Sequence, residues 1–147
     1  MRLYLARCPE TKSEEKGLLL GQMDAPLSDY GKQLSTQMGV LLAGENISLI
    51  LSSPQGRAVT TSRLIAAAQP GDKARPVVIA DGLTELSCGH WEKRPRAEAL
   101  KDGHSLRPGW GDRPPGGESY YDGEARVWAV VEQLRAMRGS GQILLVG

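Results

Sequence analysis

The sequence predicts a three-layer α/β/α sandwich built on a mostly parallel β-sheet. Two observations favour this fold class. Short segments made almost entirely of apolar residues are typical of strands buried on both faces, and amphipathic segments at helical spacing lie between them. The chain has 147 residues, enough for one domain with a substantial core, so we expect a single domain over residues 1–147.

Four segments have the composition of buried strands, because each is short, rich in Leu, Val or Ile, and nearly free of charge. They are Arg2 to Ala6, Ile47 to Leu51, Pro76 to Ala80 and Gln142 to Val146. In a parallel sheet the carboxyl ends of such strands meet at one edge, where α/β proteins build their sites.

Three longer segments have the apolar periodicity of helices. Ser28 is a suitable N-cap for a helix that runs to about Ala43, and Gly44 is expected to end it. A second helix is expected over residues 55–68. A third is expected to begin at residue 118 or 123 and to end at residue 138.

The segment from Asp81 to Gly117 differs from the rest, because it is rich in glycine, proline, tryptophan and charge. We expect it to form a long excursion from the sheet, with one short helix from Lys93 to Lys101. Long irregular segments of compact domains often carry function or mobility.

Composition excludes several classes of partner. The net charge is +1, so no global field favours binding to nucleic acid or to a membrane surface. No apolar run approaches the roughly 18–20 residues of a membrane span, and no secretory signal pattern opens the chain. Two cysteines do not make a disulfide framework. We therefore expect a reduced, cytoplasmic protein.

Five motifs follow one another along almost the whole chain. They are Arg-Cys-Pro-Glu-Thr at 7–11, Gly-Gln-Met-Asp-Ala-Pro-Leu-Ser at 21–28, Ser-Ser-Pro-Gln-Gly-Arg-Ala-Val-Thr-Thr at 52–61, Leu-Thr-Glu with Gly-His-Trp-Glu within 83–92, and Gly-Glu-Ser at 117–119. Together they resemble the motifs of the histidine phosphatase (phosphoglycerate mutase-like) superfamily. The resemblance implies the phosphoglycerate mutase-like fold, and we expect its last strand and helix to be missing, because Gly147 stands one position before the superfamily's second essential histidine.

The resemblance also implies roles for particular residues. Arg7 and Arg57 stand at the two arginine positions of the superfamily, and arginine forks suit the several charged oxygens of a phosphoryl group. Glu85 stands where the superfamily keeps the acid that protonates the leaving alcohol. Three further residues of the first two motifs are expected to organise or contact the substrate site. They are Glu10, Thr11 and Gln22.

Two substitutions alter the first motif. Cys8 replaces the histidine that attacks phosphorus, and Pro9 replaces a glycine and removes a backbone donor. A thiolate could attack phosphorus if arginines lowered its pKa, but the Cys-five residues-Arg loop of cysteine phosphatases is absent, since Glu14 holds the arginine position. The other interpretation is that Cys8 only fills the space of an imidazole. Glu14 would repel a phosphate unless it pairs with Arg7 or Arg57.

The sequence therefore predicts a degenerate site that binds phosphate, sulfate or a phosphorylated small molecule through Arg7 and Arg57, with little or no phosphoryl transfer. One alternative is an active phosphomonoesterase or mutase-like enzyme with Cys8 as nucleophile and Glu85 as general acid. The other is a non-enzymatic docking or dimerisation module, in which a homodimer covers apolar surface. We expect no cofactor and no metal, because the spacing of the two cysteines and the two histidines fits no zinc template.

Overall fold

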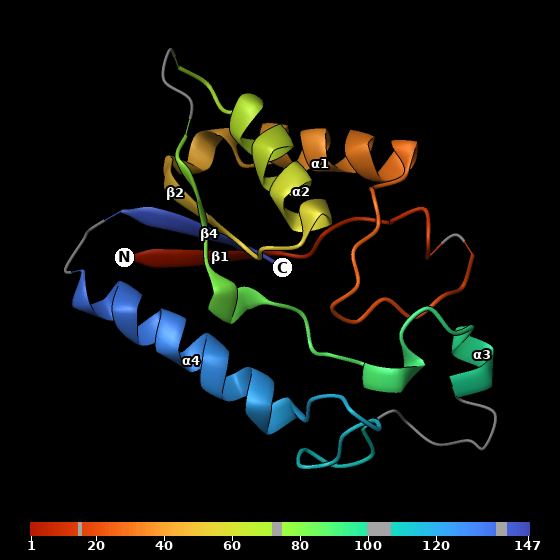
Figure 1. The fold of residues 1–147 in the computed structure, drawn as a ribbon. Coiled ribbons are helices and arrows are strands. Elements are labelled where there is room, and N and C mark those ends of the chain that lie inside the picture. The colour runs from red at the N-terminus through yellow and green to blue at the C-terminus, as the bar shows by residue number, and fades with distance from the viewer. Residues whose placement is uncertain (15, 72–74, 100–106, 138–140) are drawn as a thin grey trace.

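A four-stranded sheet forms the centre of the computed structural model, which describes residues 1–14, 16–71, 75–99, 107–137 and 141–147 (Figure 1). All three strand pairings are parallel, and the strand order is β1-β4-β2-β3. The strands are β1 (Arg2–Ala6), β2 (Ile47–Ser52), β3 (Val77–Ile79) and β4 (Gln142–Val146).

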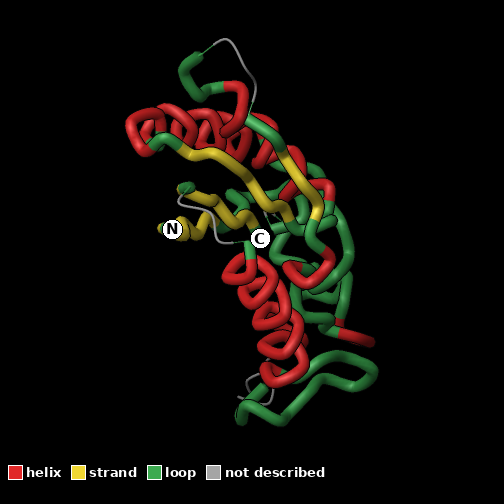
Figure 2. The backbone as a smooth tube through the Cα atoms, turned by 90° about the vertical axis from the view of Figure 1, so that its left-hand side faces the viewer, coloured by secondary structure: helices red, strands yellow, loops and turns green. Residues whose placement is uncertain are grey.

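Helices cover both faces of this sheet. Figures 1 and 2 show α1 (Asp29–Leu41) and α2 (Gly56–Ala67) on one side and α4 (Tyr120–Ala136) on the other. Successive strand residues point to opposite faces, so Leu144 packs in the core under α2 while Leu145 packs in the core under α4. The chain therefore forms the predicted three-layer arrangement. Burial on both faces holds for most of the central strands β2 and β4, whereas the outer strands β1 and β3 expose residues such as Leu5 and Val78.

The ends of several elements differ from the expected ones. Ser28 caps α1 as predicted, since its Oγ accepts a hydrogen bond from Gly31 N at 2.9 Å. A short 3₁₀ helix (Ala43–Glu45) then follows, and Asn46, with a φ of 51°, takes the left-handed conformation that was expected of Gly44. Asparagine tolerates this conformation better than other residues with side chains.

The excursion contains little regular structure in its described part, residues 81–99 and 107–117. Two 3₁₀ turns (Asp81–Leu83 and Gly89–Trp91) and the short helix α3 (Arg96–Ala99) lie there. The helix begins after Pro95 rather than at Lys93, because Lys93 has a left-handed φ of 63°, which a helix cannot contain. The rest of that predicted helix and the last residue of the helix expected to end at 138 lie outside the described residues.

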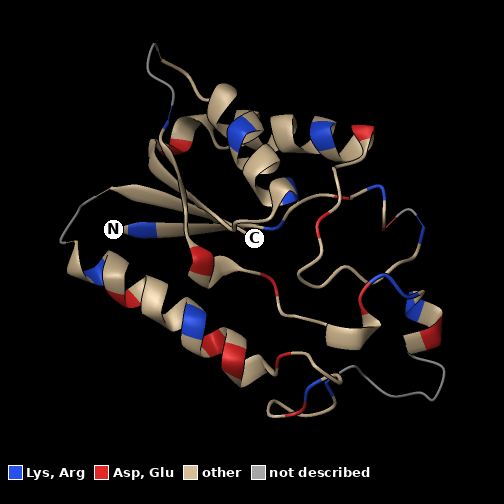
Figure 3. Ribbon diagram, viewed as in Figure 1, with Lys and Arg blue, Asp and Glu red and all other residues tan. Residues whose placement is uncertain are grey.

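Backbone hydrogen bonds fix the excursion against the segment that follows the first motif. Leu19 N donates to Arg94 O at 3.0 Å, and Lys93 N donates to Leu19 O at 2.8 Å. Two loops that are far apart in sequence therefore lie side by side at the carboxyl edge of the sheet. Figure 3 shows both signs of charge spread over helices and loops, and among the described helices none is long and apolar enough to cross a bilayer.

Candidate active site

A cavity of about 290 Å³ lies at the carboxyl edge of the sheet. Its lining includes Arg7 and Cys8 after β1, Arg57 in the first turn of α2, Glu85 of the excursion, and Gly147 after β4. The structure thus brings together the four residues that were predicted to bind the phosphoryl group or to react with it. Their meeting follows from the parallel sheet, because the carboxyl ends of β1 and β4 open on the same side.

Arg57 is buried and fixes the loop that contains Gly21 and Met23. Its guanidinium donates to Met23 O at 2.7 Å and to Gly21 O at 3.0 Å. The carboxylate of Asp24, 3.7 Å from Arg57 Nη1, accepts the backbone N–H groups of Gly56 (2.8 Å) and Arg57 (3.2 Å). Asp24 therefore caps α2 from a distant loop, and Arg57 serves both as cavity wall and as the tie to that loop.

Arg7 is exposed, and its partner is a residue of the same loop. Arg7 Nη2 lies 3.6 Å from Glu14 Oε1, with 86% of the Arg7 side chain accessible. The Glu14 carboxylate also accepts hydrogen bonds from Thr11 N (2.9 Å) and Thr11 Oγ1 (3.2 Å). Glu14 thus pairs with Arg7, one of the two arrangements that would relieve its repulsion of a phosphate. Exposed pairs of this kind are worth at most about 1 kcal/mol, so an incoming anion can compete for Arg7.

Cys8 is half-buried and packs against the core under α2. Burial raises the pKa of the Cys8 thiol above its usual value of 9.0, although the positive charge of Arg57 and a hydrogen bond with Thr61 act in the opposite direction. Burial likewise raises the pKa of the Cys88 thiol in the same cavity. Near pH 7 both groups are therefore neutral thiols, which are poor nucleophiles.

These two thiols make stability depend on alkaline pH. Their pKa values are higher in the folded chain than in the unfolded chain, so their stabilising contribution is complete below the unfolded value and is lost as pH rises through the folded value. We expect the free energy of unfolding, measured with urea, to fall above about pH 9. The variant C8A/C88A should show a shallower decline, and an equal slope in both proteins would contradict the assignment.

Glu85 is exposed and lies on an irregular loop. Its Oε1 accepts a hydrogen bond from Leu86 N at 2.7 Å. Glu85 also lines a second cavity of about 300 Å³, whose wall includes Leu83, Trp110 and Val127. It therefore stands between a charged cavity and an apolar one.

Three of the predicted site residues lie outside the described lining of the first cavity. Glu10 accepts a hydrogen bond from Ser28 Oγ at 3.0 Å, and buried Thr11 forms a bridge with Leu27. Gln22 is exposed and donates from Nε2 to Glu118 at 3.0 Å. These contacts hold the loops around the site together.

Two arginines that sequence reasoning missed also line the cavity, Arg96 and Arg107. Arg107 is buried, donates from Nε to Glu118 O at 2.7 Å and from Nη2 to Ser87 O at 2.6 Å, and lies 5.7 Å from the centre of the Tyr120 ring. Neither belongs to a motif noted in the sequence, and only the path of the excursion brings them here. Among the described residues, the cavity lining thus contains four cationic side chains, those of Arg7, Arg57, Arg96 and Arg107, beside the carboxylates of Glu14 and Glu85.

The described residues were also compared with the ligand sets of metal sites. Among the residues that the structure describes, no three side chains of His, Cys, Asp or Glu gather where they could hold a metal ion. His90 does not line the cavity, and His104 lies outside the described residues.

Comparisons with known proteins identify the family of this chain. Residues 3–147 match the model of the histidine phosphatase superfamily (branch 1). The adenosylcobalamin/alpha-ribazole phosphatase of Escherichia coli (strain K12) is 29% identical over 151 residues, which cover 99% of this chain and 72% of that protein.

Solved structures show the same fold. The alpha-ribazole phosphatase of Shigella flexneri is 29% identical with a TM-score of 0.85, covering 100% of this chain and 73% of that one. A mycobacterial glucosyl-3-phosphoglycerate phosphatase, solved with VO3, is 25% identical with a TM-score of 0.88, covering 99% of this chain and 75% of that one. The predicted fold class and the resemblance are confirmed: the chain belongs to the histidine phosphatase superfamily, branch 1.

Proposed function

We propose that this chain binds phosphate or a phosphorylated small molecule in the first cavity and carries out little or no phosphoryl transfer. The proposal rests on one observation. The same cavity contains the arginines at the two superfamily positions, Arg7 and Arg57, and the half-buried thiol of Cys8, whose pKa is raised by burial. The cavity keeps the groups that bind an oxyanion, whereas the group at the nucleophile position is held in its unreactive form.

The arginines suit an oxyanion for two reasons. A planar guanidinium can offer two parallel N–H donors to two phosphoryl oxygens, and buried Arg57 is already fixed by its bonds to Gly21 and Met23. The ion pair between Arg7 and Glu14 is exposed and therefore weak, so a bound anion can replace Glu14 as the partner of Arg7. The mycobacterial relative that was solved with VO3 supports an oxyanion as ligand.

Several features oppose transfer of the phosphoryl group. A protonated thiol must first lose its proton, and burial beside the core disfavours the thiolate. Pro9 cannot donate a backbone hydrogen bond to a phosphoryl oxygen. Among the described residues that line the cavity there is no imidazole that could take over the role of nucleophile.

The variant R7Q tests the binding site with little risk to the fold, because the Arg7 side chain is exposed. Titration calorimetry with inorganic phosphate should show a Kd about tenfold weaker than for the unchanged chain, since one charge-assisted donor is lost. The matched control is R135Q, which removes an exposed arginine of α4 that pairs with Glu132. We expect that control to leave the Kd unchanged, and equal affinity in R7Q would contradict the assignment.

Turnover distinguishes the degenerate site from an active enzyme. The unchanged chain should release p-nitrophenol from p-nitrophenyl phosphate no faster than C8A does. Ordinary enzymatic rates that disappear in C8A, together with a phosphocysteine trapped by rapid acid quench, would overturn the proposal in favour of Cys8 as nucleophile.

A further inference from the structure

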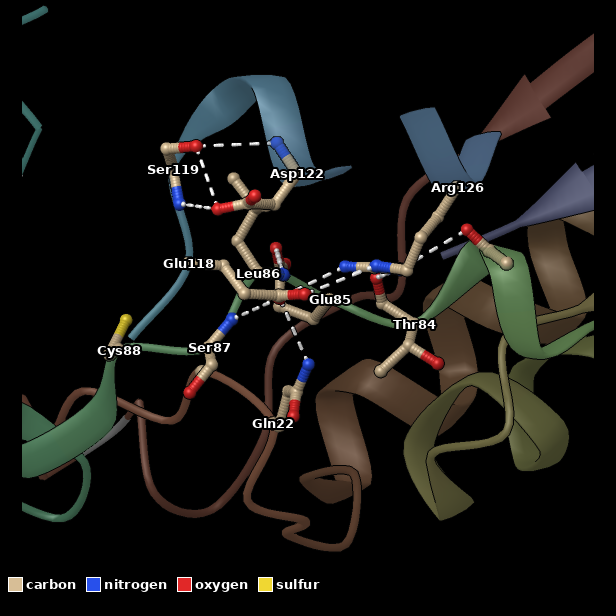
Figure 4. Close-up of polar contacts among 12 residues, drawn as sticks. Gln22, Thr84, Glu85, Leu86, Ser87, Cys88, Glu118, Ser119, Asp122 and Arg126 are labelled. Carbon is tan, nitrogen blue, oxygen red and sulfur yellow. Dashed lines mark hydrogen bonds and ion pairs between the residues drawn. The ribbon is translucent and has the colours of Figure 1, made fainter. Parts of the chain in front are cut away.

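The carboxylate of Glu118 joins three parts of the chain that are distant in sequence (Figure 4). Its Oε2 accepts hydrogen bonds from Ser87 N at 2.9 Å, from Gln22 Nε2 at 3.0 Å and from Arg126 Nη2 at 3.0 Å. Arg126 Nε completes a two-point pair with Oε1 at 3.2 Å. Only 24% of the Glu118 side chain and 27% of the Arg126 side chain are exposed, so this pair is better shielded than a surface ion pair.

Arg126 extends the contact to the other end of the same loop. Its Nη1 donates to Thr84 O at 2.8 Å and to Gly82 O at 3.2 Å. Glu118 and Arg126 therefore form hydrogen bonds with the loop of residues 84–88 at two residues, Ser87 and Thr84. Glu85 lies between these two residues, and its carboxylate accepts a hydrogen bond from Leu86 N of the same loop.

The loop needs such an anchor because residues 84–88 belong to no helix or strand. No ladder satisfies their backbone groups, so their position depends on side chains that reach them. A backbone hydrogen bond also holds the loop, since Glu118 N donates to Ser87 O at 3.1 Å. The loop also approaches α4 closely, because a Cβ placed on Gly123 would lie 2.4 Å from Leu86 Cδ2.

We propose that Glu118, together with Arg126, is a positioning residue of the first cavity: it holds residues 84–88 on α4 and so sets where Glu85 stands beside a bound anion. This inference rests on the proposed function, since it concerns the wall of the same cavity. Neither Glu118 nor Arg126 lines the cavity, so both act through the loop.

A general role in starting α4 is a different explanation, and the structure separates the two. Ser119 and Asp122 form the capping box of α4: Ser119 N donates to Asp122 Oδ2 at 2.8 Å, and Asp122 N donates to Ser119 Oγ at 3.3 Å. The Glu118 carboxylate takes no part in that box and points to the loop (Figure 4). D122N is therefore a matched control. It weakens the same end of the helix but leaves the hydrogen bonds of Glu118 and Arg126 to residues 84–88 intact.

The first measurement needs no ligand. In the unchanged chain, NMR should show a strong cross-relaxation peak between the Leu86 methyl groups and Gly123 Hα. We expect E118A to lose at least five-sixths of the intensity of this peak. D122N should keep the full intensity. E118Q should keep most of the intensity, because its amide oxygen still accepts a hydrogen bond from Ser87 N. A peak that persists in E118A, or that disappears equally in D122N, would overturn the positioning role.

The second measurement couples Glu118 to Glu85 through the affinity for sulfate, an anion whose charge does not change near neutral pH. Removing the Glu85 charge with E85Q should tighten sulfate binding about fivefold at pH 7, because a carboxylate no longer faces the anion. In the E118A background the same change should have less than a twofold effect, while in the D122N background it should remain about fivefold. An equal effect of E85Q in all three backgrounds would overturn the proposal.

The two measurements fail in different ways. If sulfate binds to none of the proteins, the proposed anion site is wrong, whereas the cross-relaxation peaks still decide whether Glu118 positions the loop. If sulfate binds and the peak in E118A is unchanged, the anion site stands and the positioning role falls.

Discussion

Replacing Arg57 by methionine is expected to abolish measurable phosphate binding and to lower the free energy of unfolding by about 2–4 kcal/mol. Methionine fills similar space but leaves the carbonyl groups of Gly21 and Met23 without their donors. An unsatisfied buried polar group costs about 1–3 kcal/mol, and two such groups are affected. Titration calorimetry measures the first effect, and urea unfolding followed by circular dichroism measures the second.

The control for this experiment is R135M on the exposed face of α4. Arg135 pairs there with Glu132 at 2.8 Å, a contact worth less than about 0.5 kcal/mol. R135M should therefore change neither phosphate affinity nor stability appreciably. Normal phosphate affinity in R57M would show that Arg57 holds the loop of Gly21 and Met23 in place but does not bind the anion.

Leucines of two neighbouring strands should respond very differently to truncation. Leu145 of β4 is paired in register with Leu5 of β1, yet Leu145 is 6% exposed and Leu5 is 81% exposed. L145A should lower the free energy of unfolding by about 3 kcal/mol, because it removes buried methyl groups and leaves a cavity under α4.

L5A is the matched control, since residue type, sheet face and substitution are the same. It should cost less than about 0.5 kcal/mol, because the Leu5 side chain is already in water. Urea unfolding of both variants measures the difference. Similar losses would mean that the open edge of β1 is covered in solution, as a homodimer would cover it.

The motifs around Arg7, Cys8, Arg57 and Glu85 indicated four residues that do meet in the first cavity. They succeed because each motif follows a strand or opens a helix of a parallel sheet, so local sequence determines where its side chains lie. The third predicted strand was longer than β3 by a residue at each end, although Pro76 O and Ala80 N still form hydrogen bonds with β2.

The excursion shows where such reasoning stops. Arg107 reaches the cavity because Ser87 and Glu118 hold it there, and nothing in its own neighbourhood in the sequence indicates those partners. The Gln22 amide donates to Glu118, a partner that its own motif does not indicate. Both contacts join segments that are distant in sequence, a long-range feature that periodicity and composition do not encode.

The position of β4 also bears on how a newly made chain reaches its fold. β4 is synthesised after β1, β2 and β3, yet it lies between β1 and β2. Until β4 leaves the ribosome, β1 has no neighbour in the sheet, and the apolar sides of α2 and α4 lack the strand on which both pack. The complete sheet, and the full core on both of its faces, can therefore form only after β4 has been made.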